Sequence, residues 1–338
     1  MQPEYSFIVP VYNRPDEIRE LLESMRKLIS KVSFEVVIIE DGSDIRCDEV
    51  VRNFSEDLNI RYYYKSNSGP GDSRNYGMKK ARANYFLILD SDVILPEYYL
   101  MEVHKSLSSC YCDCFGGPDA AHTSFSDVQK AINYSMTSFF TTGGIRGKKN
   151  AVNDFQPRSF NMGISRKAFE ASCGFGQIHP GEDPDLSLRL KKAGFKICLI
   201  PEAEVFHKRR INWSKFYTQV KKFGMVRPIL NKWHPDSSRI TYWFPSLFII
   251  GLIFSIFMAL AGQIFFIGAY LIYFLIIAID AAIKTNSIYI GMLAIRAVLV
   301  QFTGYGFGFL NSTLKTAVLN RQPEKEFPQL FFKKNIGA

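Results

Sequence analysis

The sequence contains little cysteine, and the cysteines it has lack the arrangement of a metal site. Six are present among 338 residues, and only Cys110, Cys112 and Cys114 lie close together. A structural zinc site takes about four Cys or His ligands, usually as two close pairs, and a second such cluster is missing. We therefore interpret the cysteines as buried, reduced thiols, which suits a reducing cytoplasm.

A glycine-rich phosphate-binding turn is also absent from the place where a dinucleotide-binding domain would have it. The first apolar run, residues 5–11, leads into Tyr12-Asn13-Arg14-Pro15 and not into a G-x-G-x-x-G turn. This excludes a nicotinamide-dependent dehydrogenase of the usual α/β type. No basic segment precedes the run, so we expect no signal peptide.

A large excess of basic over acidic residues is confined mainly to one segment. Residues 208–239 carry nine Lys and Arg against the single acid Asp236, whereas residues 1–207 are slightly acidic. A nucleic-acid-binding protein that is basic throughout is therefore not indicated. Two interpretations of the basic segment stay open, namely a juxtamembrane patch attracted to anionic headgroups and a site that grips a pyrophosphate-linked lipid acceptor.

Charge is missing altogether from two long apolar runs near the C-terminus. Residues 243–261 and 263–279 contain no charged side chain, and each run is about long enough to cross the hydrocarbon core of a membrane. A third run, residues 288–310, contains Arg296, which is costly in mid-membrane. A third crossing would also place the basic tail opposite the basic segment. We expect two transmembrane helices, at about 243–261 and 263–283, plus an interfacial or third helix over 288–310.

The N-terminal part of the chain alternates between the apolar periods of strands and helices. Strands are expected at residues 5–11, 34–39, 61–65 and 85–89, with helices at 15–29 and 70–82 between them, and shorter strands at 110–115, 196–200 and 204–207, with helices at 183–193 and 213–223. This order predicts an α/β domain with a mostly parallel sheet and helices on both faces. Ligands of such sheets bind beyond the carboxyl ends of the strands.

Two carboxylates follow directly after the strand expected at residues 85–89. Asp90 and Asp92 can converge on one divalent cation if the chain turns there, and their oxygen atoms suit Mg²⁺ or Mn²⁺. A cation held in this way would stabilise a departing diphosphate. Taken alone, however, acids in a loop are more often solvated or capping groups.

Asp183 stands at the start of a predicted helix. Pro184 suits the first helical position, which makes Asp183 a natural N-cap. The alternative is a general base that takes a proton from an acceptor hydroxyl group. The spacing alone supports both interpretations.

Five motifs in one order distinguish between these alternatives. They are Phe7-Ile8-Val9-Pro10-Val11-Tyr12-Asn13-Arg14, Glu40-Asp41-Gly42-Ser43, Gly69 through Arg74-Asn75-Tyr76-Gly77, Asp90-Ser91-Asp92 and Gly181-Glu182-Asp183. In this order they resemble family 2 glycosyltransferases of the GT-A fold, over about residues 4–225. The resemblance implies a GT-A fold, which is Rossmann-like, followed here by C-terminal membrane helices.

The resemblance also implies roles for individual residues. Those expected to bind the nucleotide sugar are Pro10, Tyr12 and Arg14 along the base, Asp41 as the acid that reads the base, and Arg74, Asp90 and Glu182. Asp90 and Asp92 would hold Mg²⁺ or Mn²⁺, with Asp92 as the more direct ligand. His207 would complete the metal site, although a solvated His is the alternative. Asp183 would be the catalytic base, which implies inversion at the anomeric carbon.

Two departures from the family pattern affect what can be expected. Glu40 stands where many relatives have Asp, which leaves the donor open. Residues 219–223 echo the Q-x-x-R-W motif of processive polysaccharide synthases, but Lys222 and Phe223 replace Arg and Trp. Lys lacks the planar fork of Arg. Two or three membrane spans also offer no obvious conduit for a polymer, so transfer of a single sugar is favoured.

The expected function is an inverting glycosyltransferase that moves one sugar from a UDP- or GDP-sugar to a glycan or lipid-linked acceptor. It would act at the cytoplasmic face of the cell membrane, in cell-surface polysaccharide or glycolipid synthesis. The expected layout is a GT-A catalytic domain over residues 1–207, a basic juxtamembrane segment over 208–240, a membrane region over 241–312 and a basic tail over 313–338. Two alternatives are a catalytically silent membrane adaptor, against which the intact acids count, and a processive synthase.

Overall fold

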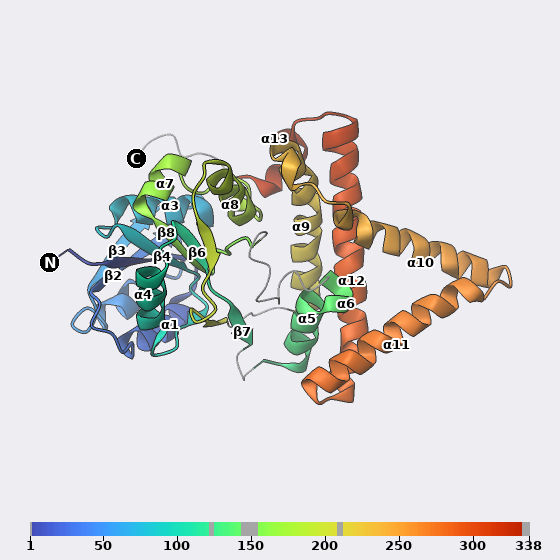
Figure 1. Ribbon diagram of the computed structural model, residues 1–338, viewed down its shortest axis with the longest axis horizontal. Coiled ribbons are helices and arrows are strands. Elements are labelled where there is room, and N and C mark those ends of the chain that lie inside the picture. Colours follow the sequence, from blue (N-terminus) through green and yellow to red (C-terminus); the bar gives the residue numbers. More distant parts are fainter. Residues whose placement is uncertain (1, 122–124, 143–154, 208–211, 333–338) are drawn as a thin grey trace. The chain divides into compact units, whose positions relative to one another are not determined.

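The structure is a computed structural model that describes residues 2–121, 125–142, 155–207 and 212–332 (Figure 1). The chain divides into two compact units. The first unit contains the described residues up to 121, residues 155–207 and the pair Phe331–Phe332, and the second contains residues 125–142 and 212–330. Each unit is described by itself.

The first unit is built on a seven-stranded sheet with the strand order β3-β2-β1-β4-β8-β6-β9. Strands β1 to β4 run parallel, β9 runs parallel to β6, and β8 is antiparallel to both of its neighbours. This confirms the predicted mostly parallel sheet. The strands are β1 (Tyr5–Val11), β2 (Phe34–Asp41), β3 (Ile60–Lys65), β4 (Tyr85–Leu89), β6 (Cys114–Gly116), β8 (Asn161–Ser165) and β9 (Ile197–Leu199).

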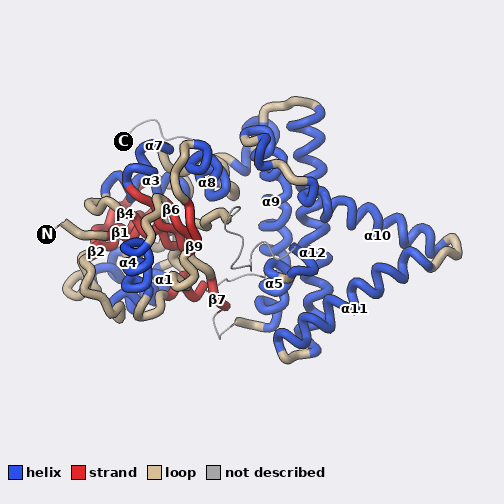
Figure 2. The backbone as a smooth tube through the Cα atoms, viewed as in Figure 1, coloured by secondary structure: helices blue, strands red, loops and turns tan. Residues whose placement is uncertain are grey.

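Helices cover both faces of this sheet, as Figure 2 shows for the strands and helices of the first unit. Alternate residues of β1 point to opposite faces, so Phe7 packs in one core cluster and Ile8 in the other. The Phe7 face is covered by α1 (Pro15–Arg26) and α4 (Tyr99–Ser109). The Ile8 face is covered by α3 (Pro70–Lys80), α7 (Arg166–Ser172) and α8 (Glu182–Lys192).

A second, three-stranded sheet pairs the short strand that follows β4 with a strand at residues 205–207. Its order is β5-β10-β7, with β5 (Val93–Ile94), β7 (Asp119–Ala121) and β10 (Val205–His207). In the antiparallel pairing of β10 with β5, His207 stands opposite Val93. The backbone of His207 therefore lies beside the residue that follows Asp92.

The interpretation of all six cysteines as reduced thiols is wrong for one pair. Cys112 and Cys198 form a disulfide, although they are 86 residues apart in the sequence. The pairing of β6 with β9 places Phe115 opposite Cys198 and so brings the two cysteines together, and sequence spacing carries no sign of this contact. Cys47 and Cys114 are buried free thiols, as expected.

The second unit is helical, and α12 (Ile288–Ser312) is its centre (Figure 1). α12 packs against α9 (Trp213–Trp233), α5 (Asp127–Thr137), α10 (Phe244–Leu260) and α11 (Phe265–Thr285). α9 is ten residues longer than the helix predicted over 213–223. A methyl group at Gly308 would lie 2.3 Å from the backbone oxygen of Lys221, so glycine permits the close approach of α12 to α9.

The helices α5 and α6 (Phe139–Thr142) belong to the second unit, although the sequence placed them inside a continuous domain of residues 1–207. The hydroxyl group of Tyr134 on α5 donates to Asp280 Oδ2 on α11 at 2.6 Å. Tyr273 on α11 donates to the backbone oxygen of Phe140 at 3.0 Å. These two bonds join α5 and α6 to an apolar helix of the second unit.

Three described helices are long and apolar enough to cross a membrane: Ile240–Leu260, Phe265–Thr285 and Ile288–Val318, with mean hydropathy values of 2.2, 2.3 and 1.4. They correspond to the three apolar runs of the sequence. α10 and α11 form a hairpin that turns at Gly262, whose φ of +85° suits glycine. Apolar side chains on the hairpin are exposed, as with Phe257 at 67% and Leu260 at 84%.

Candidate functional site

A buried arginine joins three of the sequence motifs in the first unit. The guanidinium of Arg74, on α3, donates to Asp90 Oδ1 at 2.7 Å and to Glu182 Oε1 at 3.2 Å. Its side chain is only 4% exposed. Burial would lower the pKa of Arg74, but the carboxylates of Asp90 and Glu182 outweigh burial and raise it. Arg74 therefore stays charged between acids from two distant parts of the chain.

Glu182 and Asp183 are neighbours in the first turn of α8, but their surroundings differ. Glu182 is bonded to Arg74 and to Nδ1 of His179, the latter at 2.8 Å. Burial would raise the pKa of Glu182, but His179 and Arg74 outweigh burial and lower it. Glu182 is therefore held as a carboxylate between Arg74 and His179.

Asp183 has one engaged and one unengaged carboxylate oxygen. Oδ2 accepts from the backbone N–H of Ser159 at 3.2 Å, whereas Oδ1 is buried and has no hydrogen-bond partner among the described residues. Burial, followed by the negative charge of Glu182, raises the pKa of Asp183 to about 6, against the opposing effects of Arg74 and Arg158. A buried carboxylate oxygen without a partner can accept a proton from a bound molecule.

The N-cap interpretation of Asp183 is wrong. α8 begins at Glu182, one residue earlier than predicted, and Gly181 occupies the N-cap with a φ of +124°. Only glycine adopts this backbone conformation readily. Because no side chain caps α8, the helix leaves Asp183 free for another role.

Asp90 and Asp92 lie in the turn between β4 and β5. The side chain of Asp90 is 34% exposed, and Asp92 is half-buried. Their oxygen donors fit Mg²⁺ or Mn²⁺, and the β5–β10 pairing brings the backbone of His207 to the same turn. The side chain of His207 lies outside the described part of the structure, and the described residues contain no group of three or more His, Cys, Asp or Glu poised around a metal.

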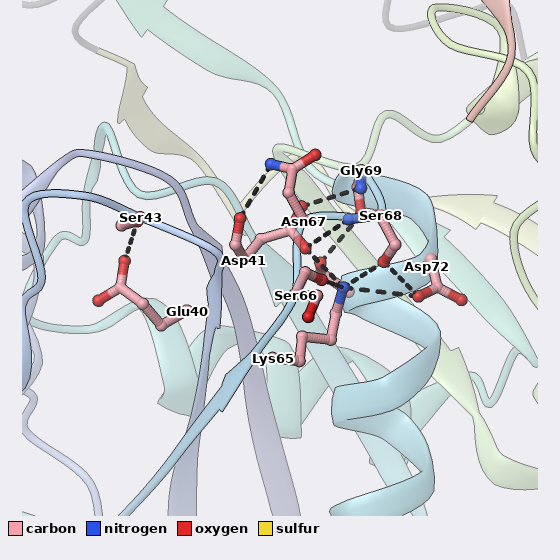
Figure 3. Close-up of polar contacts among 10 residues, drawn as sticks. Glu40, Asp41, Ser43, Lys65, Ser66, Asn67, Ser68, Gly69 and Asp72 are labelled. Carbon is pink, nitrogen blue, oxygen red and sulfur yellow. Dashed lines mark hydrogen bonds and ion pairs between the residues drawn. The ribbon is translucent and has the colours of Figure 1, made fainter. Parts of the chain in front are cut away.

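Asp41 ends β2 and organises the loop that leads into α3 (Figure 3). Its Oδ1 accepts from Lys65 Nζ at 2.5 Å and from the N–H of Ser68 at 3.0 Å, and its Oδ2 accepts from the N–H of Gly69 at 2.9 Å. Glu40 lies on the other side of the strand, where it accepts from Ser43. Asp41 thus fixes residues 65–69, and its expected contact with a base stays a prediction.

The first motif ends in exposed side chains beside the loop that follows β2. Tyr12 is 50% exposed, Arg14 is also exposed, and Pro10 is half-buried. Asn13 has a φ of +54°, and its Oδ1 accepts from the N–H groups of Asp44 and Ile45. Asn13 therefore ties the first motif to the second, a role that sequence reasoning missed.

Sequence reasoning also missed contacts from the end of the chain. The backbone N–H of Phe332 donates to the oxygen of Gln177 at 3.1 Å, and its ring centroid lies 5.8 Å from that of His179. The Phe332 ring also covers Gly69, where a methyl group would lie 2.4 Å from it. Phe332 thus contacts Gly69 of the third motif and His179, the partner of Glu182, and neither a motif nor residue spacing predicts these contacts.

Comparisons with known proteins agree with this geometry. The family described as "Glycosyl transferase family 2" matches residues 6–171. An uncharacterized glycosyltransferase of Rickettsia felis is 34% identical over 142 residues, which are 41% of this chain and 22% of that protein. The poly(ribitol-phosphate) beta-N-acetylglucosaminyltransferase TarS of Staphylococcus aureus is 38% identical over 113 residues, which are 32% of this chain and 20% of that protein. The matches thus span less than a quarter of these relatives.

Solved structures show the same fold over nearly the whole chain. The mannosyltransferase PcManGT from Pyrobaculum calidifontis, in complex with GDP-Man and Mn²⁺, aligns with a TM-score of 0.58 at 15% identity and covers 93% of this chain and 88% of that one. At this identity the likeness is one of fold. Residues 6–171 match glycosyl transferase family 2, and the mostly parallel sheet and the apolar helices that follow it agree with the GT-A fold and the C-terminal membrane helices expected from the sequence.

Proposed function

We propose that this chain is an inverting glycosyltransferase that moves a single sugar from a nucleotide diphosphate sugar to a glycan or lipid-linked acceptor at a membrane surface. One observation carries the proposal. Asp183 has a buried oxygen without a partner among the described residues and a pKa raised to about 6, next to the cluster of Arg74, Asp90 and Glu182. The proposed base for the acceptor, Asp183, therefore lies next to the residues proposed to bind the donor.

The proposed reaction is a single displacement. Oδ1 of Asp183 takes the proton of an acceptor hydroxyl while the oxygen of that hydroxyl forms a bond to the anomeric carbon. The bond from this carbon to the diphosphate breaks, and the nucleotide diphosphate leaves with the electron pair. Attack opposite the leaving group inverts the anomeric centre. With a pKa of about 6, Asp183 is ionised at neutral pH yet basic enough to accept the proton.

The donor would be bound by the residues that surround Arg74. Tyr12, exposed at the end of β1, offers its ring to a nucleotide base, with Pro10 and Arg14 beside it and the loop that Asp41 fixes opposite. A Mg²⁺ or Mn²⁺ ion held by Asp90 and Asp92, with His207 as a further ligand, would stabilise the departing diphosphate. PcManGT, a protein of the same fold, binds GDP-Man and Mn²⁺, which supports a UDP- or GDP-sugar as the donor class.

Membrane placement follows from contacts within the second unit. Lys232 Nζ, at the end of α9, donates to Asn320 Oδ1 at 2.6 Å, so the chain returns after α12 to the point from which it enters α10. An even number of crossings brings it back to the same side. This supports two crossings, by α10 and α11, with α12 along the membrane surface. We propose that the first unit lies at the cytoplasmic face of the cell membrane. Arg296 on α12 lies over the Trp213 ring of α9, away from lipid.

The proposal is tested with the purified full-length chain, a panel of UDP- and GDP-sugars, and Mn²⁺. We expect release of free nucleotide from at least one donor. The Asp183→Asn variant should lose about 10²- to 10⁴-fold in rate, the usual contribution of a general base, while nucleotide binding by calorimetry stays unchanged. Asp57→Asn, which alters an exposed carboxylate paired with Arg26, serves as the control.

Two results would contradict the proposal. A full rate in Asp183→Asn would remove the assigned base. An absence of metal-dependent nucleotide binding in the unaltered chain would instead favour a silent adaptor.

A further inference from the structure

The second unit contains a cavity that the proposed transfer reaction does not use. It has a volume of about 370 Å³ and lies where α9 ends, α10 begins and α12 continues into the π-helix η3 (Thr313–Val318). This volume is at the lower end of the range of roughly 300–1,000 Å³ for small-molecule sites. The residues that matter below are Asn231, Lys232, Trp243, Phe309, Thr313 and Thr316, and all of them line it.

Two polar atoms of the lining are buried without a partner among the described residues. They are Oδ1 of Asn231, on α9, and Oγ1 of Thr313, at the start of the π-helix. Buried polar atoms in native proteins are nearly always hydrogen-bonded, so each such exception calls for an explanation. A ligand in the cavity would supply both partners at once, since the two residues line the same space.

The cavity carries a positive charge that no acid in its lining balances. Lys232 is the one charged residue among the described lining residues. Its Nζ donates to two neutral oxygens, Asn320 Oδ1 at 2.6 Å and the backbone oxygen of Thr316 at 3.3 Å. These bonds hold the ammonium group in place and leave its charge for an anion.

A tryptophan at the start of an apolar helix lines the cavity. Trp243 directly precedes α10, whose residues 244–260 contain no charge, and tryptophan is enriched where a membrane meets water. One wall is aromatic, because the rings of Trp243 and Phe309 meet edge to face at 5.0 Å. The opposite wall comes from the π-helix, a rare form that is frequent at functional sites.

We propose that this cavity binds the phosphate group of a membrane lipid. Lys232 supplies the charge, the hydroxyl of Thr313 donates to a phosphate oxygen, and Oδ1 of Asn231 accepts from the P–O–H of the singly protonated phosphate. Trp243 and Phe309 contact the glycerol and the first carbons of the chains. The site belongs to the second unit and is independent of the donor site.

The test uses the full-length chain in detergent and three probes: dihexanoyl phosphatidic acid, dihexanoylglycerol and inorganic phosphate. Binding is measured as a rise in Tm with probe concentration. Phosphatidic acid should raise Tm. Dihexanoylglycerol, which lacks the phosphate, should not, and inorganic phosphate should bind more weakly than the lipid.

Two variants separate binding from folding. Lys232→Gln removes the charge, and Thr313→Val replaces the unpartnered hydroxyl with a methyl group of equal size, so its Tm without lipid should not fall. Both should weaken the binding of phosphatidic acid by about tenfold, the effect of one lost charge-assisted hydrogen bond. Lys221→Gln, an exposed lysine of α9 outside the cavity lining, should bind as the unaltered chain does.

Several outcomes would overturn the proposal. Equal stabilisation by dihexanoylglycerol would show that the phosphate is not recognised. Equal affinity for inorganic phosphate would remove the lipid as the source of the group. Unchanged lipid binding in both cavity variants would place the lipid elsewhere on the chain.

Discussion

Glu182 and Asp183 show how strongly their surroundings can shift the pKa values of two adjacent carboxyl groups in opposite directions. Burial acts on both, but cationic neighbours outweigh it at Glu182, whereas at Asp183 burial and the charge of Glu182 prevail. Paired acids whose pKa values are pushed apart commonly divide the tasks of a site. Here Glu182 holds Arg74 and His179 in position, and Asp183 is left able to take a proton.

The first prediction concerns the pH dependence of transfer. Asp183 must be ionised to act as a base, and its pKa is raised to about 6. The rate kcat/KM should therefore be constant at pH 7–8 and fall as the pH drops below 6, by about tenfold per pH unit. Rates measured across pH at acceptor concentrations well below KM report kcat/KM, and a flat profile down to pH 5 would contradict the assignment.

The second prediction separates the effect of Asp183 on the stability of the folded protein from its proposed role as a base. Its pKa is raised on folding from 3.8 to about 6, so the ionised group disfavours the folded state fully above pH 6, and this effect vanishes as the pH falls below 3.8. Asp183→Asn should therefore unfold at an equal or higher Tm at pH 8, with a smaller gain near pH 4. A lower Tm at pH 8 would indicate a structural role instead.

The third prediction concerns Asp41, whose carboxylate is almost fully buried and bonded to Lys65, Ser68 and Gly69. Asp41→Ala removes the buried partner of Lys65, leaves Asp72 as its remaining carboxylate, and takes the acceptor away from the N–H groups of Ser68 and Gly69, so it should lower the free energy of unfolding by about 3 kcal/mol or more. Asp72→Ala, which removes the exposed second partner of Lys65, should lower it by less than about 1 kcal/mol. Chemical denaturation compares the two, and equal losses would mean that burial of Asp41 is unimportant.

At the scale of elements, the site depends on the backbone turns that precede two helices, α3 and α8. α3 follows Gly69 and α8 follows Gly181, and both glycines have a positive φ that turns the chain sharply from a loop into the helix. These turns bring Arg74 and Glu182 together near the carboxyl end of β4. The loop before α3 is further covered by Phe332, so a residue from the far end of the chain packs on a helix start.

The fourth prediction tests this contact. Gly69→Ala adds both backbone strain, at a φ of +93°, and a clash with the Phe332 ring. Gly194→Ala is the matched control, because its φ is +82° and nothing lies within 4 Å of the added methyl group. Gly194→Ala should cost about 1–2 kcal/mol of unfolding free energy, and Gly69→Ala clearly more. Adding Phe332→Ala to Gly69→Ala should recover part of the difference, and no recovery would argue against the contact.

At the scale of the whole molecule, a domain built on a mostly parallel sheet is joined in sequence to a unit of apolar helices. In the sequence, α5 and α6 lie between two segments of the sheet domain, but the hydrogen bonds of Tyr134 and Tyr273 join them to α11 of the helical unit. The apolar hairpin of α10 and α11 leaves large side chains exposed, which is expected of a surface that faces lipid.

The fifth prediction concerns the number of crossings. Single cysteines at Asp236 and Gln322, in a chain without its exposed native thiols Cys110 and Cys173, should react with an impermeant maleimide from the same side of sealed vesicles. A cysteine at Gln263, in the hairpin turn, should react from the opposite side. Labelling of positions 236 and 322 from opposite sides would establish three crossings.

The sequence by itself determined the local elements and the family. Runs such as residues 5–11 and 85–89 form strands because a buried parallel strand is apolar throughout, and runs such as 265–285 form helices apolar enough for lipid. Boundaries were less accurate, as with α9, which extends to Trp233, and β6, which begins only at Cys114. Ordered motifs were sufficient to identify the residues that now surround Arg74.

Only the tertiary structure decided which distant residues touch. Three contacts join residues that are far apart in the chain. Arg74 bonds both Asp90 and Glu182, Cys112 forms a disulfide with Cys198, and the ring of Phe332 covers Gly69. Periodicity and spacing report on neighbours within a few turns, because they reflect which side of one element is buried. Contacts across tens or hundreds of residues depend on how whole elements pack, and so do burial, the pKa of Asp183 and the cavity beside Trp243.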